Sequence, residues 1–137
     1  MKIKYRVWDK KAKEMNAVWS INFMGGNVET VKKKIDFDDA QLMQFTGFND
    51  KNNVEIFEGD IIGIDVYYID EFGEKYKERN YAEVFRDDYG CWDCDFKDNL
   101  DSEFLLSYVN EENHREQPWN ITVEGNVYSH SHLLEKE

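Results

Sequence analysis

Residues 42–62, LMQFTGFNDKNNVEIFEGDII, constrain the fold of this chain more than any other stretch. Apolar and polar residues alternate from Leu42 to Thr46, a period of two that is typical of a strand with one buried face. Two turn signals follow, at residues 49–53 and 58–60, because Asn and Asp tolerate the left-handed conformation and Gly adopts positive φ freely. The stretch therefore predicts three strands that are separated by tight turns.

The same alternation of strands and turns continues along most of the chain. Further strands are predicted at residues 2–8, 15–23, 28–35, 77–85, 91–96 and 119–128. One helix is expected near residues 98–110, where Leu100, Phe104 and Tyr108 recur at helical spacing. The predicted fold class is mainly β (α+β at most), with antiparallel hairpins that form a small barrel or a bent sheet.

Length and composition favour one globular domain. The chain has 137 residues, of which 41% are hydrophobic, so we expect a single domain over residues 1–137 with a modest core. No apolar run approaches the roughly 20 residues that span a bilayer, and the N-terminal residues have no apolar run of signal-peptide length. These features predict a cytoplasmic protein that does not enter a membrane.

Charge is distributed unevenly along the chain. Residues 1–34 contain nine Lys or Arg against three acids, whereas residues 35–137 contain eight against 26. The net charge of −12 disfavours direct binding of nucleic acid, because a polyanion is repelled. A basic partner, or contact between basic and acidic regions of two copies in a homo-oligomer, is compatible with this pattern.

A group of acids near the middle of the chain has three interpretations. Asp87, Asp88, Asp93 and Asp95 could form an interaction surface for a cationic partner, or only a solvated acidic face. A calcium site is the third alternative, but the spacing matches no EF-hand loop.

Cys91 and Cys94 form a C-x-x-C pair, which with histidines could bind zinc. In a strand, however, these two side chains point to opposite faces, so two reduced cysteines are expected. No metal or other cofactor is therefore predicted.

Arg6, Trp8 and Trp19 form a basic and aromatic set on the first predicted hairpin. Such a set can stack on bases, or it can pack within the sheet through cation–π contacts. Packing of both tryptophans into the hairpin is the favoured interpretation.

Three blocks of the chain resemble the YopX family of small proteins from phages and prophages of Gram-positive bacteria. They are the N-terminal RVWD, the middle block described first, and the C-terminal VEGNVY. The residues that carry the resemblance are Arg6, Trp8, Asp9, Gln44, Thr46, Gly47, Asp50, Glu58, Gly59, Asp60, Gly125, Asn126 and Tyr128. Asn53 stands where the family usually has Gly, and Asn can replace Gly at a left-handed position. The resemblance implies the origin and the β fold, and it transfers no activity.

Function is constrained mainly by what the residues lack. Neither a catalytic constellation nor a phosphate-binding glycine loop is recognisable in the sequence. We therefore expect a non-enzymatic accessory protein of a phage or prophage that binds a host or phage macromolecule in the bacterial cytoplasm. The alternatives are an acidic, DNA-mimicking antagonist of a nucleic-acid-binding protein and a small enzyme of unrecognised type.

Overall fold

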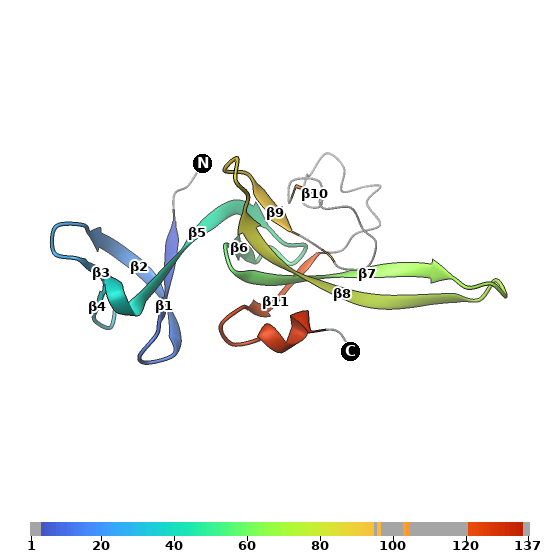
Figure 1. Cartoon of the computed structure of the whole chain (residues 1–137), viewed down its shortest axis with the longest axis horizontal. Helices are drawn as coiled ribbons and strands as arrows, with labels where there is room; N and C mark the ends of the chain where they lie inside the picture. The colour runs from blue at the N-terminus through green and yellow to red at the C-terminus, as the bar shows by residue number, and fades with distance from the viewer. Residues whose placement is uncertain (1–3, 95, 97–102, 105–120, 136–137) are drawn as a thin grey trace. The chain divides into compact units, whose positions relative to one another are not determined.

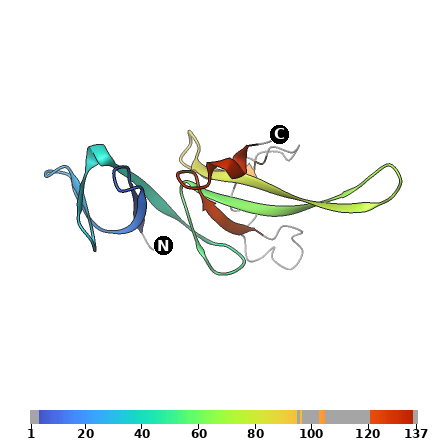
Figure 2. The same ribbon diagram turned by 90° about the horizontal axis from the view of Figure 1, so that it is seen from below.

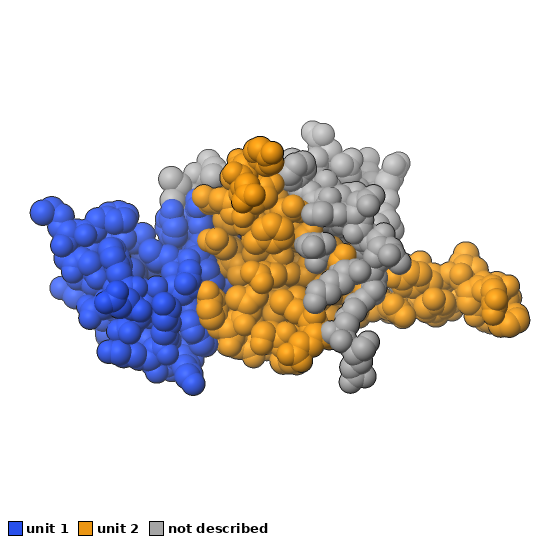
Figure 3. All heavy atoms as spheres, in the orientation of Figure 1, with its two compact units in different colours: residues 1–47 blue, residues 48–137 orange. Residues whose placement is uncertain are grey.

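The computed structural model describes residues 4–94, 96, 103–104 and 121–135. The chain divides into two compact units, residues 1–47 and residues 48–137 (Figure 3). That these two units belong to the single domain expected over residues 1–137 stays a prediction.

Strands dominate the described residues, so the mainly β prediction is confirmed (Figure 1). The strands are β1 (Tyr5–Asp9), β2 (Glu14–Asn22), β3 (Asn27–Thr30), β4 (Lys34–Asp36), β5 (Ala40–Asn49), β6 (Glu55–Phe57), β7 (Asp60–Ile69), β8 (Lys75–Arg86), β9 (Trp92–Cys94), β10 (Glu103–Phe104) and β11 (Thr122–Asn126). Two short 3-10 helices, η1 (Phe37–Asp39) and η3 (Ser131–Leu134), accompany them.

The first unit is an antiparallel sheet in the order β4-β3-β2-β1-β5. Its core consists of Val7, Val28 and Ile35, which are buried on one face of the sheet. Alternation places these residues inward, because successive side chains of a strand point to opposite faces. Strand β5 continues past Gly47, whose φ is 90°, and β6 neighbours β5 in the strand order.

The second unit contains a five-stranded sheet in the order β10-β9-β8-β7-β11. Ile62 and Ile64 of β7 and Ala82 and Val84 of β8 contribute to its core, and none of them is exposed to solvent. Burial of several branched side chains is the main stabilising contribution here, at roughly 25 cal/mol per Å² of apolar surface.

Strands β7 and β8 form a long two-stranded ribbon. They pair from Ile61 with Glu83 to Ile69 with Lys75. Strand β11 accompanies β7 only along Asp60–Gly63, and β9 accompanies β8 only along residues 84–86. The far half of the ribbon consequently extends beyond its neighbouring strands, as Figures 1 and 2 show.

Three sequence predictions need correction or restriction. The helix expected at residues 98–110 is wrong at Glu103 and Phe104, which pair with β9, and the rest of that range lies outside the described residues. Of the two architectures expected, the small barrel is not formed: the described strands make two open sheets. Trp19 is 71% exposed rather than packed, since the register of β2 shifts between Val18 and Ser20 and removes Trp19 from the alternation.

Candidate functional site

Three aspartates of the predicted signature are almost completely buried. Asp9 and Asp60 are each 1% exposed, and Asp50 is 7% exposed. A buried carboxylate is costly unless hydrogen bonds or a cation compensate it. Their partners therefore decide whether these residues serve chemistry or structure.

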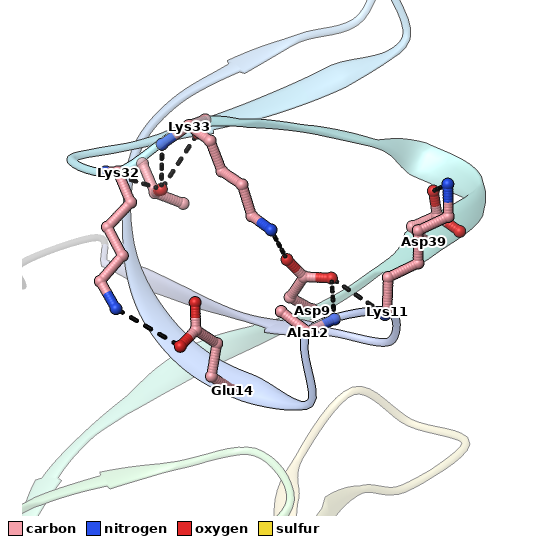
Figure 4. Close-up of polar contacts among 8 residues, drawn as sticks. Asp9, Lys11, Ala12, Glu14, Lys32, Lys33 and Asp39 are labelled. Atoms are coloured by element: carbon pink, nitrogen blue, oxygen red, sulfur yellow. Dashed lines mark hydrogen bonds and ion pairs between the residues drawn. The ribbon is translucent and has the colours of Figure 1, made fainter.

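Asp9 ends β1 and organises the turn that leads to β2. Its Oδ1 accepts hydrogen bonds from the backbone N–H of Lys11 at 3.0 Å and of Ala12 at 3.1 Å. Its Oδ2 lies 2.6 Å from the Lys33 ammonium, which comes from the segment before β4 (Figure 4). Asp9 thus joins the first turn of the sheet to the segment that enters its edge strand.

The ion pair shifts both groups toward their charged forms. The hydrogen bond from Lys33, followed by that from the Ala12 N–H, lowers the pKa of Asp9 against the opposing effect of burial. The same bond raises the pKa of Lys33. Asp9 is held as a carboxylate and is unsuited to act as a proton donor or acceptor near neutral pH.

A shallow polar pocket of about 160 Å³ adjoins this pair. It is lined by Asp9, Lys11, Lys33, Lys34, Ile35, Asp36 and Asp39. The Lys11 ammonium lies 3.2 Å from the Asp39 carboxylate, and Lys32 lies 3.3 Å from Glu14 beside it (Figure 4). Both acidic and basic side chains line the pocket, which fits an ion-pair network that stabilises the turn better than a site for a charged ligand.

Asp50 connects a hairpin turn to a strand far away in the sequence. Its Oδ1 accepts the N–H groups of Asn52 and Val54, both at 2.8 Å. Its Oδ2 accepts the Val123 N–H of β11 at 2.9 Å. Asn53 has a φ of 64°, so the left-handed position expected there is confirmed.

The second turn of the signature is also closed by backbone contacts. The Phe57 N–H donates to Oδ2 of Asp60 at 2.8 Å. Gly59 has a φ of 83°, its N–H donates to the Val84 carbonyl, and its carbonyl accepts the Val127 N–H. Asp60 therefore bonds a turn amide.

The C-terminal block forms a third local motif. Oδ1 of Asn126 accepts the N–H groups of Tyr128 and Ser129, both at 3.0 Å. The Asn126 N–H donates to Nδ1 of His130, and a Cβ at position 125 would lie 2.5 Å from that imidazole ring. Gly125 is required because the His130 ring occupies the space of a side chain.

The remaining signature residues are spread over β1, β5 and the turns. Arg6, Trp8, Gln44 and Glu58 are half-buried, Thr46 is buried, and Gly47 and Tyr128 are exposed. The structure thus brings the signature together in turns and strand pairs, and not in one cluster of reactive groups.

The sequence predictions did not include the polar contacts that Arg79 of β8 makes with β7 and β11. The Arg79 guanidinium lies over Gly63, where an added Cβ would be 2.8 Å from it, and it contacts Asp65 at 3.1 Å. It also bonds Thr122 and Glu124 of β11. A lone Gly inside the apolar run DIIGIDVYY was the available signal, since such a glycine often marks a close approach.

The predicted acidic surface is only partly described. Asp88 is exposed, whereas Asp87 and Asp93 are half-buried and accept hydrogen bonds from nearby backbone N–H groups. Asp95 lies outside the described residues. Cys91 is exposed and Cys94 is buried, consistent with side chains that point in different directions.

Large apolar side chains are exposed on two hairpins. The hairpin formed by β2 and β3 carries Trp19, Phe23 and Met24, and the β7–β8 ribbon carries Tyr67, Ile69, Phe72 and Tyr76. Across the residues that the structure describes, no three His, Cys, Asp or Glu side chains are grouped so that they could hold a metal ion. The described part also contains no helix that is long and apolar enough to cross a membrane.

Comparisons with known proteins agree with the described fold. The family model described as YopX protein matches residues 4–135. The crystal structure of protein EF1440 from Enterococcus faecalis is similar, with a TM-score of 0.62 and 24% sequence identity. That similarity covers 98% of this chain and 99% of the other. A search of curated proteins found no match.

Proposed function

This chain belongs to the YopX protein family. Because resemblance to that family implies a phage or prophage origin, we propose that the chain is a phage- or prophage-encoded accessory protein. It acts in the cytoplasm of the host bacterium and binds a host or phage protein without catalysing a reaction. Its exposed β2–β3 hairpin supplies the binding surface, and its buried carboxylates supply stability.

The polar groups support a role without catalysis. Asp9, Asp50 and Asp60 lie on different turns, and each accepts a backbone N–H within its own turn. A general acid–base pair needs two groups that converge on one reacting atom. Within the described ranges, these carboxylates stabilise turns instead of facing a common cavity.

The observation that carries the proposal is the exposed apolar side chains on the β2–β3 hairpin. Trp19 is 71%, Phe23 78% and Met24 101% exposed. Burying a large apolar side chain contributes roughly 1.5–3 kcal/mol, so leaving three of them in water forgoes considerable stability. Tryptophan is enriched among the residues that dominate binding energy at protein interfaces.

Charge indicates what kind of protein surface would fit this hairpin. Residues 1–47 contain nine Lys or Arg against six acids, and Lys32 and Lys34 are exposed. A partner surface with an apolar centre and acids at its rim would complement the unit. Rim charges of this kind raise the association rate more than the affinity.

Capture from host lysate with matched variants tests the proposal. We expect the full chain to retain a specific protein, and Trp19→Ser combined with Phe23→Ser to reduce its capture at least about tenfold, which corresponds to about 1.4 kcal/mol. Tyr89→Ser is the control, because Tyr89 is 92% exposed but lies in another turn. Equal capture by all three folded proteins would contradict the proposal.

An acidic antagonist is the second candidate. Residues 48–137 contain 23 acids against eight Lys or Arg, and Glu71, Glu74 and Asp88 are exposed. Such a surface would attract a basic, nucleic-acid-binding protein, with an association rate that falls as salt rises. Reversing the exposed Glu71 and Asp88 to Lys should then slow association. An unchanged rate across about tenfold changes in salt would exclude this candidate.

A further inference from the structure

The far half of the β7–β8 ribbon has two edges that no described strand covers. Pairing with β11 ends at Gly63, and pairing with β9 begins only at Val84. Beyond these points, the ribbon consists of two strands alone among the residues that the structure describes. A two-stranded ribbon is marginally stable in water, and an uncovered edge offers backbone N–H and C=O groups to another strand.

The two edges differ in their side chains. The uncovered part of β8 contains Lys75, Lys77, Glu78 and Arg79, and charged residues, lysine especially, protect an edge against pairing. The uncovered part of β7, with the sequence IDVYYI, contains a single charged residue. That residue is Asp65, and Arg79 of the same ribbon neutralises it at 3.1 Å.

Exposed apolar groups accompany the unprotected edge. Tyr67 is 65% and Ile69 is 68% exposed, and alternation places them on the same face of β7 as Asp65. An edge that combines β-forming residues, low charge and exposed apolar side chains is a pairing site.

We propose that the β7 edges of two copies of this chain pair antiparallel about a two-fold axis at Tyr67. The two ribbons then form one four-stranded sheet with the order β8-β7-β7-β8. This dimer goes beyond the proposed binding of another protein, which uses the β2–β3 hairpin, so either proposal can fail while the other stands.

The register of the ribbon favours a second copy as the occupant. A two-fold axis perpendicular to a sheet pairs residues of the same face, so the two residue numbers in a pair add to an even number. Centring the axis on Tyr67 places Tyr67 opposite itself and Asp65 opposite Ile69 of the second copy. No like charges face each other in these pairs, and apolar contact follows across the axis.

The same operation on the outer half of the β8 edge gives unfavourable pairs. An axis at Tyr76 would place Lys75 opposite Lys77 of the second copy, and an axis at Lys77 would place Lys75 opposite Arg79. Like charges directly opposite each other destabilise a strand pair. The charge pattern thus disfavours pairing of the outer half of β8 and favours β7, beside which Lys75 and Lys77 of β8 then border the paired strands on both sides.

Sedimentation velocity on the full chain tests the dimer. We expect dimers to form as the concentration rises from about 1 to about 100 µM, and Tyr67→Lys to weaken dimerisation at least about tenfold, because it places two ammonium groups at the axis. Phe72→Lys is the matched control. It also replaces an exposed aromatic side chain with Lys, but at the tip of the ribbon and away from the edge, so the dimer should persist.

Disulfide trapping tests the register independently of stability. Residues directly opposite in an antiparallel pair have Cβ atoms about 4.5–5.5 Å apart, close to disulfide geometry. With the exposed Cys91 changed to Ser, Tyr67→Cys should form a covalent dimer under mild oxidation, and Tyr76→Cys on β8 should not.

Three results would overturn the proposal. The first is a parent chain that stays monomeric throughout the concentration range, including one whose β7 edge binds only a strand of another protein. The second is a dimer that Tyr67→Lys leaves intact. The third is equal trapping at positions 67 and 76.

Discussion

The hairpin turns at Asp50 and Asp70 have the same local hydrogen bonds but different surroundings. In each, Oδ1 of the aspartate accepts two backbone N–H groups at 2.8–2.9 Å, from Asn52 and Val54 in one turn and from Phe72 and Glu74 in the other. Only Asp50 uses its second carboxylate oxygen on a distant strand, through the Val123 N–H. Asp50 itself is buried, whereas Asp70 is half-buried, and residues 51–54 and 71–74 of the two turns are exposed.

The same turn occurs a third time at Asp87. Its Oδ1 accepts the N–H groups of Tyr89 and Cys91, and Gly90 has a φ of 82° where Gly73 has 79°. The comparison teaches that an aspartate turn defines a hairpin wherever it occurs. It contributes to tertiary structure only where the second oxygen finds a distant partner.

The largest expected effect comes from breaking that second contact. Asp50→Asn keeps an oxygen for the turn but points an amide donor at the Val123 N–H. Because an unsatisfied buried group and a lost charged hydrogen bond both destabilise, we expect the free energy of unfolding to fall by about 2 kcal/mol or more. Urea unfolding followed by circular dichroism measures it. A midpoint equal to that of the parent chain would show that the contact contributes nothing.

Glycine positions separate backbone strain from burial. Gly59 and Gly73 have φ values of 83° and 79°, but Gly59 is buried and Gly73 is exposed. A side chain in this conformation costs about 1–2 kcal/mol, so the free energy of unfolding should fall by about that amount in Gly73→Val. Gly59→Val should lose more, since its N–H and C=O also bond Val84 and Val127. Equal urea midpoints for the two variants would mean that burial adds nothing.

Acid should weaken the first unit through Asp9. Its pKa is lower in the folded chain than the usual 3.8, so its contribution to stability is complete above that pH and is lost as the pH falls through the lower folded-state pKa. Asp9→Asn should therefore be less stable than the parent at neutral pH and should lose less stability below about pH 4. Lys33→Met should show part of the same effect, that is, a smaller loss of stability than the parent chain as the pH falls. Parallel pH profiles for all three would contradict the assignment.

The smallest effect is expected at Asp70. Asp70→Asn retains an oxygen for the Phe72 and Glu74 N–H groups, and asparagine also supports such turns. We expect a change below about 0.5 kcal/mol, as for most surface substitutions. A loss as large as that of Asp50→Asn would remove the distinction between the two turns.

Much of the fold could be predicted from the sequence because its information is local. Alternation and turn residues identified the hairpins around Asp50 and Gly59, and the positive φ of Asn53 followed from its chemistry. The helix prediction failed at Glu103 and Phe104 because tertiary pairing with β9 overrides helical spacing in a short apolar segment.

Contacts between distant residues could not be predicted in the same way. Neither the bond from Val123 to Asp50 nor the contact of Arg79 with Glu124 has a periodic signal in the sequence. Trp19 was expected to pack, but a bulge of one residue in β2 changes its direction, and bulges are set by the pairing of strands. The exposed surface on which the proposed function depends was therefore recognisable only in the structure.

Amide hydrogen exchange tests the difference between the two aspartate turns most directly. We predict that the Val54 and Val123 amides exchange slowly, close to the rate set by global unfolding, and that the Phe72 and Glu74 amides exchange much faster through local opening. Asp50→Asn should accelerate exchange at Val123, and Asp70→Asn should leave it unchanged. Equal protection of the Phe72 and Val123 amides in the parent chain, or a Val123 amide that Asp50→Asn does not affect, would contradict the account.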